Sequence, residues 1–241
     1  MTNDLKFLID VVKQASELIT DDFQVKAKGN NGDLVTNFDF EIEKFIIDKI
    51  KINYPDFKIV SEEFNSKEGL VDNCFTIDPI DGTVNFAHNL PLWGIQVACI
   101  KDGKTCAAVI YLVKLKELFC ADETGAYLNG EKIQVNSLSM KNGLFVVEGS
   151  NRYPSIIKMQ KYALKPRVYN CACIDFAWVA CGRLNGVIFT NDTIWDYTPG
   201  LYIAKQAGAV VINESKSHIA ANTPELAEIL RKEVGNESKN K

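Results

Sequence analysis

The run Asp78-Pro79-Ile80-Asp81-Gly82-Thr83 combines two carboxylates, a rigid turn and a place for an anion. It follows the apolar stretch 74–77, so its acids emerge where a predicted strand ends. Pro79 fixes its own φ and biases the preceding aspartate towards an extended conformation. Both carboxylates can then point into one space with the isoleucine carbonyl between them, and such oxygens are the ligands that hard divalent cations select. Because the glycine allows close approach and the threonine can open a helix with free N–H groups, the run predicts a joint metal and phosphate site.

Three other segments carry acids at the ends of predicted elements: Ser61-Glu62-Glu63, the run from Asp33 to Asp39, and Trp195-Asp196. Binding residues usually sit at such ends. Taken alone, each has an ordinary explanation: the glutamate pair suits a solvated turn, Asp39 a helix N-cap, and Asp196 a cap for a helix opened by Pro199. Only the run that begins at Asp78 is persuasive by itself.

The composition is that of an ordinary globular protein of 241 residues, with 46% apolar and 24% charged residues. This length suits one large domain or two small ones that share a core. The net charge of −4 argues against a nucleic-acid surface. Charged side chains within the first 19 residues exclude a signal peptide and a membrane span there. Seven cysteines without a disulfide spacing predict reduced thiols and a cytoplasmic protein.

Hydrophobic periodicity predicts helices over 5–19 and 39–52, separated by a loop that begins at Lys28. Short strands are expected between turn signals at 57–60, 74–77, 94–100, 106–112 and 117–120. Asp102-Gly103 and Asn129-Gly130 are typical of hairpin turns. This order of elements, with helices first and strands after them, favours an α+β fold of layered sheets and helices rather than a barrel.

A second half begins near residue 143, and it alternates strands with helices. Strands are expected at 144–147, 167–169, 186–190 and 209–212. Helices are expected at 154–163, 175–181, 199–207 and from Thr223-Pro224 onward, and the tail 235–241 is expected to fray. A soft boundary therefore divides one compact unit into halves 1–145 and 146–241.

The acidic segments together resemble the inositol monophosphatase family of metal-dependent phosphatases, to whose superfamily fructose-1,6-bisphosphatases also belong. That family is recognised by a Glu-Glu motif, a D-P-[ILM]-D-G-[ST] motif and a later W-D motif. Here they stand in the same order as Glu62-Glu63, Asp78–Thr83 and Trp195-Asp196, after a D-L-V-T segment that starts at Asp33. The resemblance covers about residues 5 to 230. It implies a layered α-β-α-β-α sandwich, commonly a homodimer, and an activity that lithium often inhibits.

The resemblance also implies how the acids divide between ions. Glu62, Asp78 and the Ile80 carbonyl would hold one Mg²⁺; Asp78, Asp81 and Asp196 would hold a second. Glu62 would reach a loosely bound third ion.

Other residues have roles around the phosphate by the same resemblance. Gly82 and Thr83 would bind it through backbone N–H groups, with the Thr83 hydroxyl hydrogen-bonded to Asp39. Lys28 matches a loop lysine that approaches the active site. The reaction expected is hydrolysis of a phosphate monoester of a small metabolite by a metal-activated water, which Thr83, Asp39 and Glu62 position, without a protein nucleophile.

The substrate end departs from the inositol-selective pattern. Such relatives carry a Gly-Ser/Thr-Ala segment, and a glutamate seven residues before the W-D aspartate, that bind sugar hydroxyls. This chain has Asn170-Cys171-Ala172 and Phe189 at those places, so Asn170, Ala172 and Phe189 are predicted to line the substrate pocket. Since phenylalanine cannot accept a hydrogen bond, the substrate stays open among inositol phosphate, fructose 1,6-bisphosphate, a 3′-nucleotide and the 2′-phosphate of NADP.

Alternative activities have weaker support. A haloacid-dehalogenase motif also ends in Asp-Gly-Thr, but one residue separates its acids, whereas two separate Asp78 from Asp81. The two histidines, His88 and His218, have no nucleophile context. Cys171, Cys173 and Cys181 lack the spacing of a zinc site and are expected to be buried thiols. A silent binding or regulatory protein on the same fold is a further alternative, which the intact acids disfavour.

Overall fold

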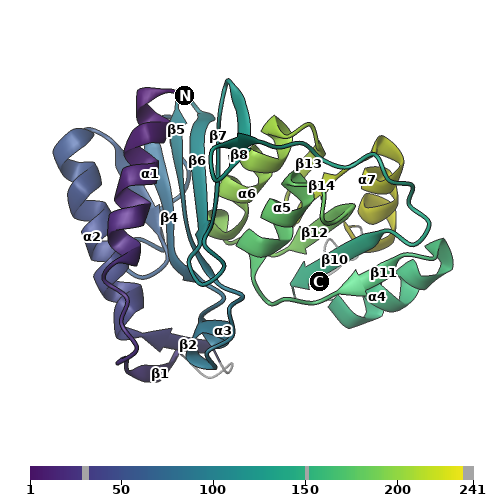
Figure 1. Ribbon diagram of the computed structural model, residues 1–241, viewed down its shortest axis with the longest axis horizontal. Helices are drawn as coiled ribbons and strands as arrows, with labels where there is room; N and C mark the ends of the chain where they lie inside the picture. The colour runs from purple at the N-terminus through teal and green to yellow at the C-terminus, as the bar shows by residue number, and fades with distance from the viewer. Residues whose placement is uncertain (29–32, 150–151, 236–241) are drawn as a thin grey trace.

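The computed structural model describes residues 1–28, 33–149 and 152–235 of the chain. Helices and two sheets alternate in layers along its long axis (Figure 1). Most of the predicted loop at 28–32 and the predicted frayed tail lie outside the described residues. The layered α+β class predicted from the order of elements is confirmed.

The first sheet has seven strands in the order β3-β4-β5-β6-β7-β8-β9. Their bounds are β3 (Lys58–Ser61), β4 (Cys74–Asp81), β5 (Gly94–Lys101), β6 (Lys104–Leu112), β7 (Glu117–Asp122), β8 (Gly125–Leu128) and β9 (Glu131–Lys132). Both predicted hairpin turns are confirmed. Asp102 and Gly103 have φ of 51° and 72°, and Asn129 and Gly130 have φ of 50° and 87°, the paired positive values of a type I′ turn.

Helices α1 (Asn3–Ser16) and α2 (Asn37–Asn53) cover the outer face of this sheet (Figure 1). The predicted periodicity of α1 is confirmed, because its buried residues are Leu5, Leu8, Val11, Val12 and Ala15. A two-stranded ribbon of β1 (Val25–Lys28) and β2 (Asp33–Thr36) joins the two helices. The ribbon was not predicted, because strands of four residues give little periodic signal.

The second sheet has five strands in the order β11-β10-β12-β14-β13. Their bounds are β10 (Leu144–Gly149), β11 (Lys165–Arg167), β12 (Gly186–Thr190), β13 (Val210–Glu214) and β14 (Ser217–Ala221). β14 was not predicted, and β11 begins two residues before the predicted strand. The predicted boundary between residues 145 and 146 falls inside β10, and the division into halves stays a prediction.

Helices α5 (Ala172–Ala180) and α6 (Ile194–Gln206) fill the space between the two sheets (Figure 1). One buried apolar cluster contains residues of both helices and of both sheets. The helices cross closely at Gly200, where an added Cβ would lie 2.4 Å from Cβ of Phe176. Helix α4 (Arg152–Met159), with a 3₁₀ turn at Gln160–Tyr162, and helix α7 (Pro224–Leu230), with a π turn at Arg231–Gly235, pack against the outer face of the second sheet.

Two local predictions were wrong, and both concern proline. Pro199 does not open its helix, because α6 begins five residues earlier, at Ile194, after Thr193. A proline in the second turn removes one hydrogen bond, and the buried packing around α6 compensates for that loss. Pro199 and Gly200 are themselves buried in that packing. Pro79 likewise does not end β4, which continues to Asp81 with an irregular register.

No helix in the described parts of the chain combines the length and apolar character needed to cross a bilayer.

Candidate active site

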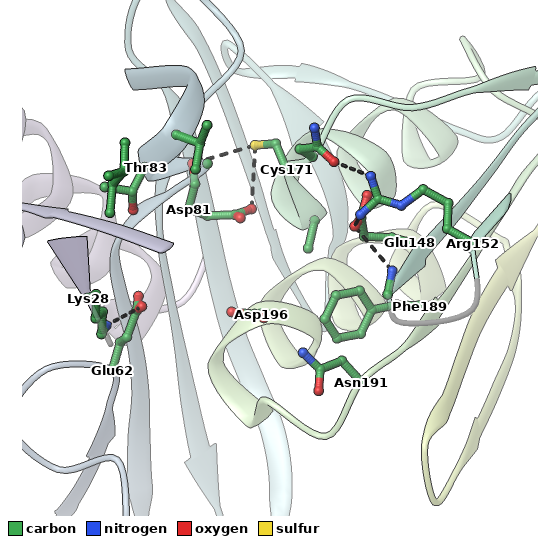
Figure 2. Close-up of a pocket in the computed structure, with 16 residues that line it drawn as sticks. Lys28, Glu62, Asp81, Thr83, Glu148, Arg152, Cys171, Phe189, Asn191 and Asp196 are labelled. Carbon is green, nitrogen blue, oxygen red and sulfur yellow. Dashed lines mark hydrogen bonds and ion pairs between the residues drawn. The ribbon is translucent and has the colours of Figure 1, made fainter. Parts of the chain in front are cut away.

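A pocket of about 480 Å³ opens between the two sheets, at the end of β4. Figure 2 shows Lys28, Glu62, Asp81 and Thr83 on one side of it and residues of the second half of the chain on the other. The residues that line it include these sequence-predicted ones: Lys28, Glu62, Asp81, Gly82, Thr83, Asn170, Ala172, Phe189 and Asp196. The fold therefore brings together acids and substrate-side residues that are far apart in the sequence.

A bulge at the end of β4 presents its two aspartates. Asp78 pairs with Gln96 of β5, whereas Asp81 pairs with Gly94, so β4 carries one extra residue over this stretch. Pro79 suits a bulge because it has no N–H for the ladder. A bulge re-aims the side chains around it. The sequence marked the right residues, although they continue a strand rather than follow one.

Asp78, Asp81 and Asp196 form an acidic cluster in which Asp78 is buried and the other two are partly buried. Burial raises the pKa of Asp78 well above its ordinary range, and Glu62 and the other two aspartates raise it further. Burial also raises the pKa of Asp196, with Asp81 as the next cause. The pKa of Asp81 is raised by burial, although the backbone N–H of Cys173 works against that rise. The cluster repels itself when ionised, so a cation among these acids would be stabilising.

Gln96 connects Asp78 to Asp196. Its buried side-chain amide donates to Oδ2 of Asp78 and to the backbone carbonyl of Asp196, both at 3.3 Å. Thr193 donates its hydroxyl to the carboxylate of Asp196. Sequence reasoning did not find Gln96, because a single polar residue inside an apolar strand has no motif to mark it.

Lys28 lies against the glutamate pair. Its Nζ is 2.7 Å from Oε1 of Glu62 and 2.5 Å from Oε1 of Glu63. Burial works to lower the pKa of Lys28, but the two carboxylates raise it overall. Glu43, which is buried in α2, holds the segment in place by accepting from the Ser61 hydroxyl and from the backbone N–H of Glu63. The lysine thus reaches the acids, as the resemblance implied.

Thr83 and Asp39 approach each other only loosely. The Thr83 hydroxyl is 3.4 Å from Oδ1 of Asp39, but 2.9 Å from the Ile80 carbonyl, so the better hydrogen bond goes to the carbonyl. Asp39 is not an N-cap. It occupies the third position of α2 and accepts from the backbone and hydroxyl of Thr36, at 2.7 and 2.6 Å, in a capping box. Burial raises the pKa of Asp39 to about 7, against those hydrogen bonds.

Gly82 shapes the backbone turn at which the phosphate is expected to bind. It is the N-cap of the short helix α3 (Thr83–Ala87) and has φ of 87°, a left-handed conformation that favours glycine. An added Cβ would lie 2.9 Å from the Leu92 carbonyl. Since α3 has only five residues, any anion there would bind to individual N–H groups rather than to a long helix dipole.

The opposite wall has an apolar and a polar part. Phe189 of β12 is buried, and its register partner on β10 is Glu148. Glu148 pairs with Arg152 (Figure 2). The guanidinium of Arg152 also donates to the side-chain oxygen of Asn170. Oε2 of Glu148 is buried and has no hydrogen-bond partner among the described residues. Sequence reasoning missed Glu148 and Arg152, although an acid at the end of an apolar strand was a usable signal.

The residues present fit a hard divalent cation. Glu62, Asp81 and Asp196 offer only oxygen ligands to the pocket. Oδ1 of Asp78 is buried without a hydrogen-bond partner among the described residues, which leaves a carboxylate oxygen free for an ion. The ammonium group of Lys28 shows that the Glu62 side already holds a positive charge. Asp33 belongs to the same sequence motif, but its side chain lies outside what the structure describes.

Comparison with known proteins places this site in a family. A model of the inositol monophosphatase family matches residues 1–238. The chain belongs to the inositol monophosphatase family. As a member, it is a hydrolase of phosphate monoesters, and the haloacid-dehalogenase alternative is excluded. The predicted fold type is confirmed by the structure of a Thermotoga maritima IMPase, with a TM-score of 0.86 and 28% identity, which covers 98% of this chain and 99% of that one.

Two relatives of this chain differ in the substrates for which they are named. An inositol-1-monophosphatase of Synechocystis is 35% identical over 200 residues, which is 78% of this chain and 69% of the relative. A fructose-1,6-bisphosphatase/inositol-1-monophosphatase of Thermotoga maritima is 33% identical over 195 residues, or 79% and 75% of the two chains. The names agree on phosphatase activity and differ on the substrate.

Proposed function

We propose that this protein is a Mg²⁺-dependent phosphomonoesterase that hydrolyses a small phosphorylated polyol or sugar. One observation carries the proposal: Asp81 and Asp196 line one pocket with the Gly82-Thr83 turn, and they raise the pKa of the neighbouring buried carboxyl of Asp78. Hard oxygen ligands favour Mg²⁺ over softer ions. The two or three ions expected from the resemblance are part of the proposal.

Each acid has a proposed part in holding the ions and the phosphate. Glu62, Asp78 and the Ile80 carbonyl would hold one ion, and the three aspartates a second. When bound, such ions supply positive charge to the phosphoryl group and lower the pKa of a water molecule. The N–H groups of Gly82 and Thr83 would hold the phosphate oxygens.

Thr83 and Asp39 would handle the proton of the attacking water. The Thr83 hydroxyl lies between the Ile80 carbonyl and Oδ1 of Asp39, so it can accept from water on one side and donate to the carboxylate on the other. A carboxyl whose pKa is about 7 can take and release a proton near neutral pH. Lys28 would keep the glutamates oriented until substrate and ions arrive.

The polar end of the pocket favours hydroxyl groups over a second phosphate. Glu148 sits beside Arg152 and offsets its charge, so this end has little net positive charge with which to bind a second phosphate. The carboxylate of Glu148, which lines the pocket, can instead accept from a substrate hydroxyl, while Asn170 and Arg152 offer donors. Phe189 and Ala172 would supply the apolar wall. The pocket therefore fits the monophosphate of a polyol or sugar better than fructose 1,6-bisphosphate.

The substitution Glu148→Gln should raise KM for the preferred substrate by about tenfold with little change in kcat, because a hydrogen bond to a charged group is worth roughly 1.5–3 kcal/mol. Steady-state kinetics measures both constants. Glu117→Gln, which removes a carboxylate paired with Arg183 on the surface, is the matched control and should change neither. An unchanged KM in the Glu148 variant would show that this acid does not contact the substrate.

The activity itself is tested by phosphate release from inositol, sugar, nucleotide and NADP phosphates, with Mg²⁺, with chelator and with added Li⁺. We expect release that requires Mg²⁺, is suppressed by Li⁺ and is fastest with a polyol or sugar monophosphate. Tight Mg²⁺ binding without release from any substrate would instead favour a silent regulator. Preference for the 3′-nucleotide, for NADP or for fructose 1,6-bisphosphate would contradict the proposed substrate class, although the proposed reaction would still be supported.

We also propose a homodimer in the cytoplasm, without a nucleic-acid partner. The dimer rests on the family resemblance, and the other two points rest on seven free cysteines and a net charge of −4. Light scattering of the purified protein tests the dimer, and a mass of one chain would contradict it.

A further inference from the structure

Two thiols and a carboxylate meet at the wall of the pocket. Sγ of Cys171 is 3.4 Å from Sγ of Cys173 and 3.5 Å from Oδ2 of Asp81. One ligand atom from each of the three residues lies within 4.8 Å of the other two. Tetrahedral zinc, with bonds of about 2.3 Å to sulfur and about 2.0 Å to oxygen, places a sulfur and an oxygen about 3.5 Å apart. The three atoms are therefore spaced like ligands of one ion.

The backbone fixes this arrangement firmly. Cys171 is the N-cap of α5 and Cys173 stands in its first turn, so both thiols are on the end of the helix that faces β4. The backbone N–H of Cys173 donates to Oδ2 of Asp81. The predicted burial is confirmed for both of these cysteines and was wrong for Cys181, which is only partly buried. Their spacing alone gives no zinc motif, because the third ligand comes from β4, ninety residues earlier.

The cluster is open to an ion on one side. Cys171 and Asp81 both line the pocket, whereas Cys173 lies behind them. Three protein ligands and one position that faces a cavity are the pattern of a zinc site that keeps a place for water or an anion. Without a metal, hydrogen bonds join the two thiols to each other and Cys171 to Asp81, and a bound ion would replace these contacts.

We propose that Asp81, Cys171 and Cys173 form a second metal site, selective for thiophilic divalent cations such as Zn²⁺ and Cd²⁺. Sulfur ligands select these ions and are poor ligands for Mg²⁺. Because Asp81 also belongs to the proposed magnesium site, the two ions compete for it. Zinc at this site inhibits the enzyme, and this inhibitory part rests on the proposed function.

The two thiols bind the metal as thiolates, and their protons leave to solvent.

Titration of the metal-free protein with Cd²⁺ alone tests the site, through the ultraviolet charge-transfer absorption of cadmium–thiolate bonds. We expect one Cd²⁺ per chain. Removing a group that only orients a ligand costs roughly 10–100-fold in affinity, so loss of a ligand in Cys173→Ala should raise the Kd by more than about 100-fold. Cys181→Ala, the same change at the other end of α5, is the matched control and should bind Cd²⁺ normally.

Two results would overturn the site: no thiolate absorption in the wild-type protein, or absorption that survives both Cys171→Ala and Cys173→Ala. Thermal unfolding of each variant checks that it folds. Cys171→Ala, at the residue that lines the pocket, answers the question if Cys173→Ala does not fold. No substrate enters this experiment, so its outcome is independent of the phosphatase assay.

The inhibitory part needs an active enzyme. Zn²⁺ should suppress Mg²⁺-dependent phosphate release reversibly, and Cys173→Ala should need more than about tenfold higher Zn²⁺ for half-inhibition of its own rate. Equal sensitivity of the variant and the wild-type protein would overturn the inhibition even if Cd²⁺ binds. Absence of turnover in every sample would count against the proposed function and leave the cadmium result standing.

Discussion

The substitution Asp81→Asn should lower kcat by at least about 10³-fold while the protein stays folded. The amide keeps the shape of the carboxylate, and its oxygen can still accept from the backbone N–H of Cys173. The variant loses one of the three negative charges that would surround the bound cation. Phosphate release under saturating Mg²⁺ measures the effect.

Asp48→Asn is the matched control, because this acid pairs with Lys44 on the exposed face of α2. It should keep wild-type turnover. Thermal unfolding without metal should show Asp81→Asn to be at least as stable as the wild-type protein, since it removes one charge from a self-repelling cluster. Near-normal turnover in Asp81→Asn would mean that the cluster does not hold the catalytic ions.

Saturating Mg²⁺ should raise the melting temperature by about 5–10 °C, and the increase should grow as the pH rises. The folded-state pKa values of Asp78, Asp81 and Asp196 are raised. Carboxyls of this kind stabilise the fold at pH values below their unfolded pKa of about 3.9, and that stability is lost as the pH rises through the raised folded values. Metal-free protein therefore loses this contribution above about pH 4, whereas Mg²⁺ offsets the repulsion.

Melting curves at several values between about pH 5 and pH 8, with Mg²⁺ and with chelator, measure this difference. The Asp81→Asn variant shows whether the effect comes from this cluster or from other acids. Its melting temperature should rise much less when Mg²⁺ is added. A wild-type increase that is independent of pH would show that protons and Mg²⁺ do not compete at these carboxylates.

The acids of the site were predictable from the sequence because they stand at the ends of apolar runs. Asp81, at the end of β4, and Asp196, in the first turn of α6, line one pocket, and Asp78 is buried three residues before Asp81 in the same strand. The layered α+β class followed from the order of helices and strands for the same reason. These features are local, so a single sequence carries them.

The remaining features depend on contacts between distant segments. Gln96 is positioned by the register of β4 against β5, and Glu148 by the register of β10 against β12. Pro199 lies inside a helix because packing between the sheets outweighs its local preference to begin one. Local patterns do not contain this information.

The most direct test of the central claim is phosphate release by chelator-stripped protein to which Mg²⁺ is added back, with the preferred polyol or sugar monophosphate. The proposed function predicts no release without metal, release restored by Mg²⁺, and release at least about 10³-fold slower from Asp81→Asn at every Mg²⁺ concentration. Full activity in the stripped protein, or equal activity in the variant, would contradict it.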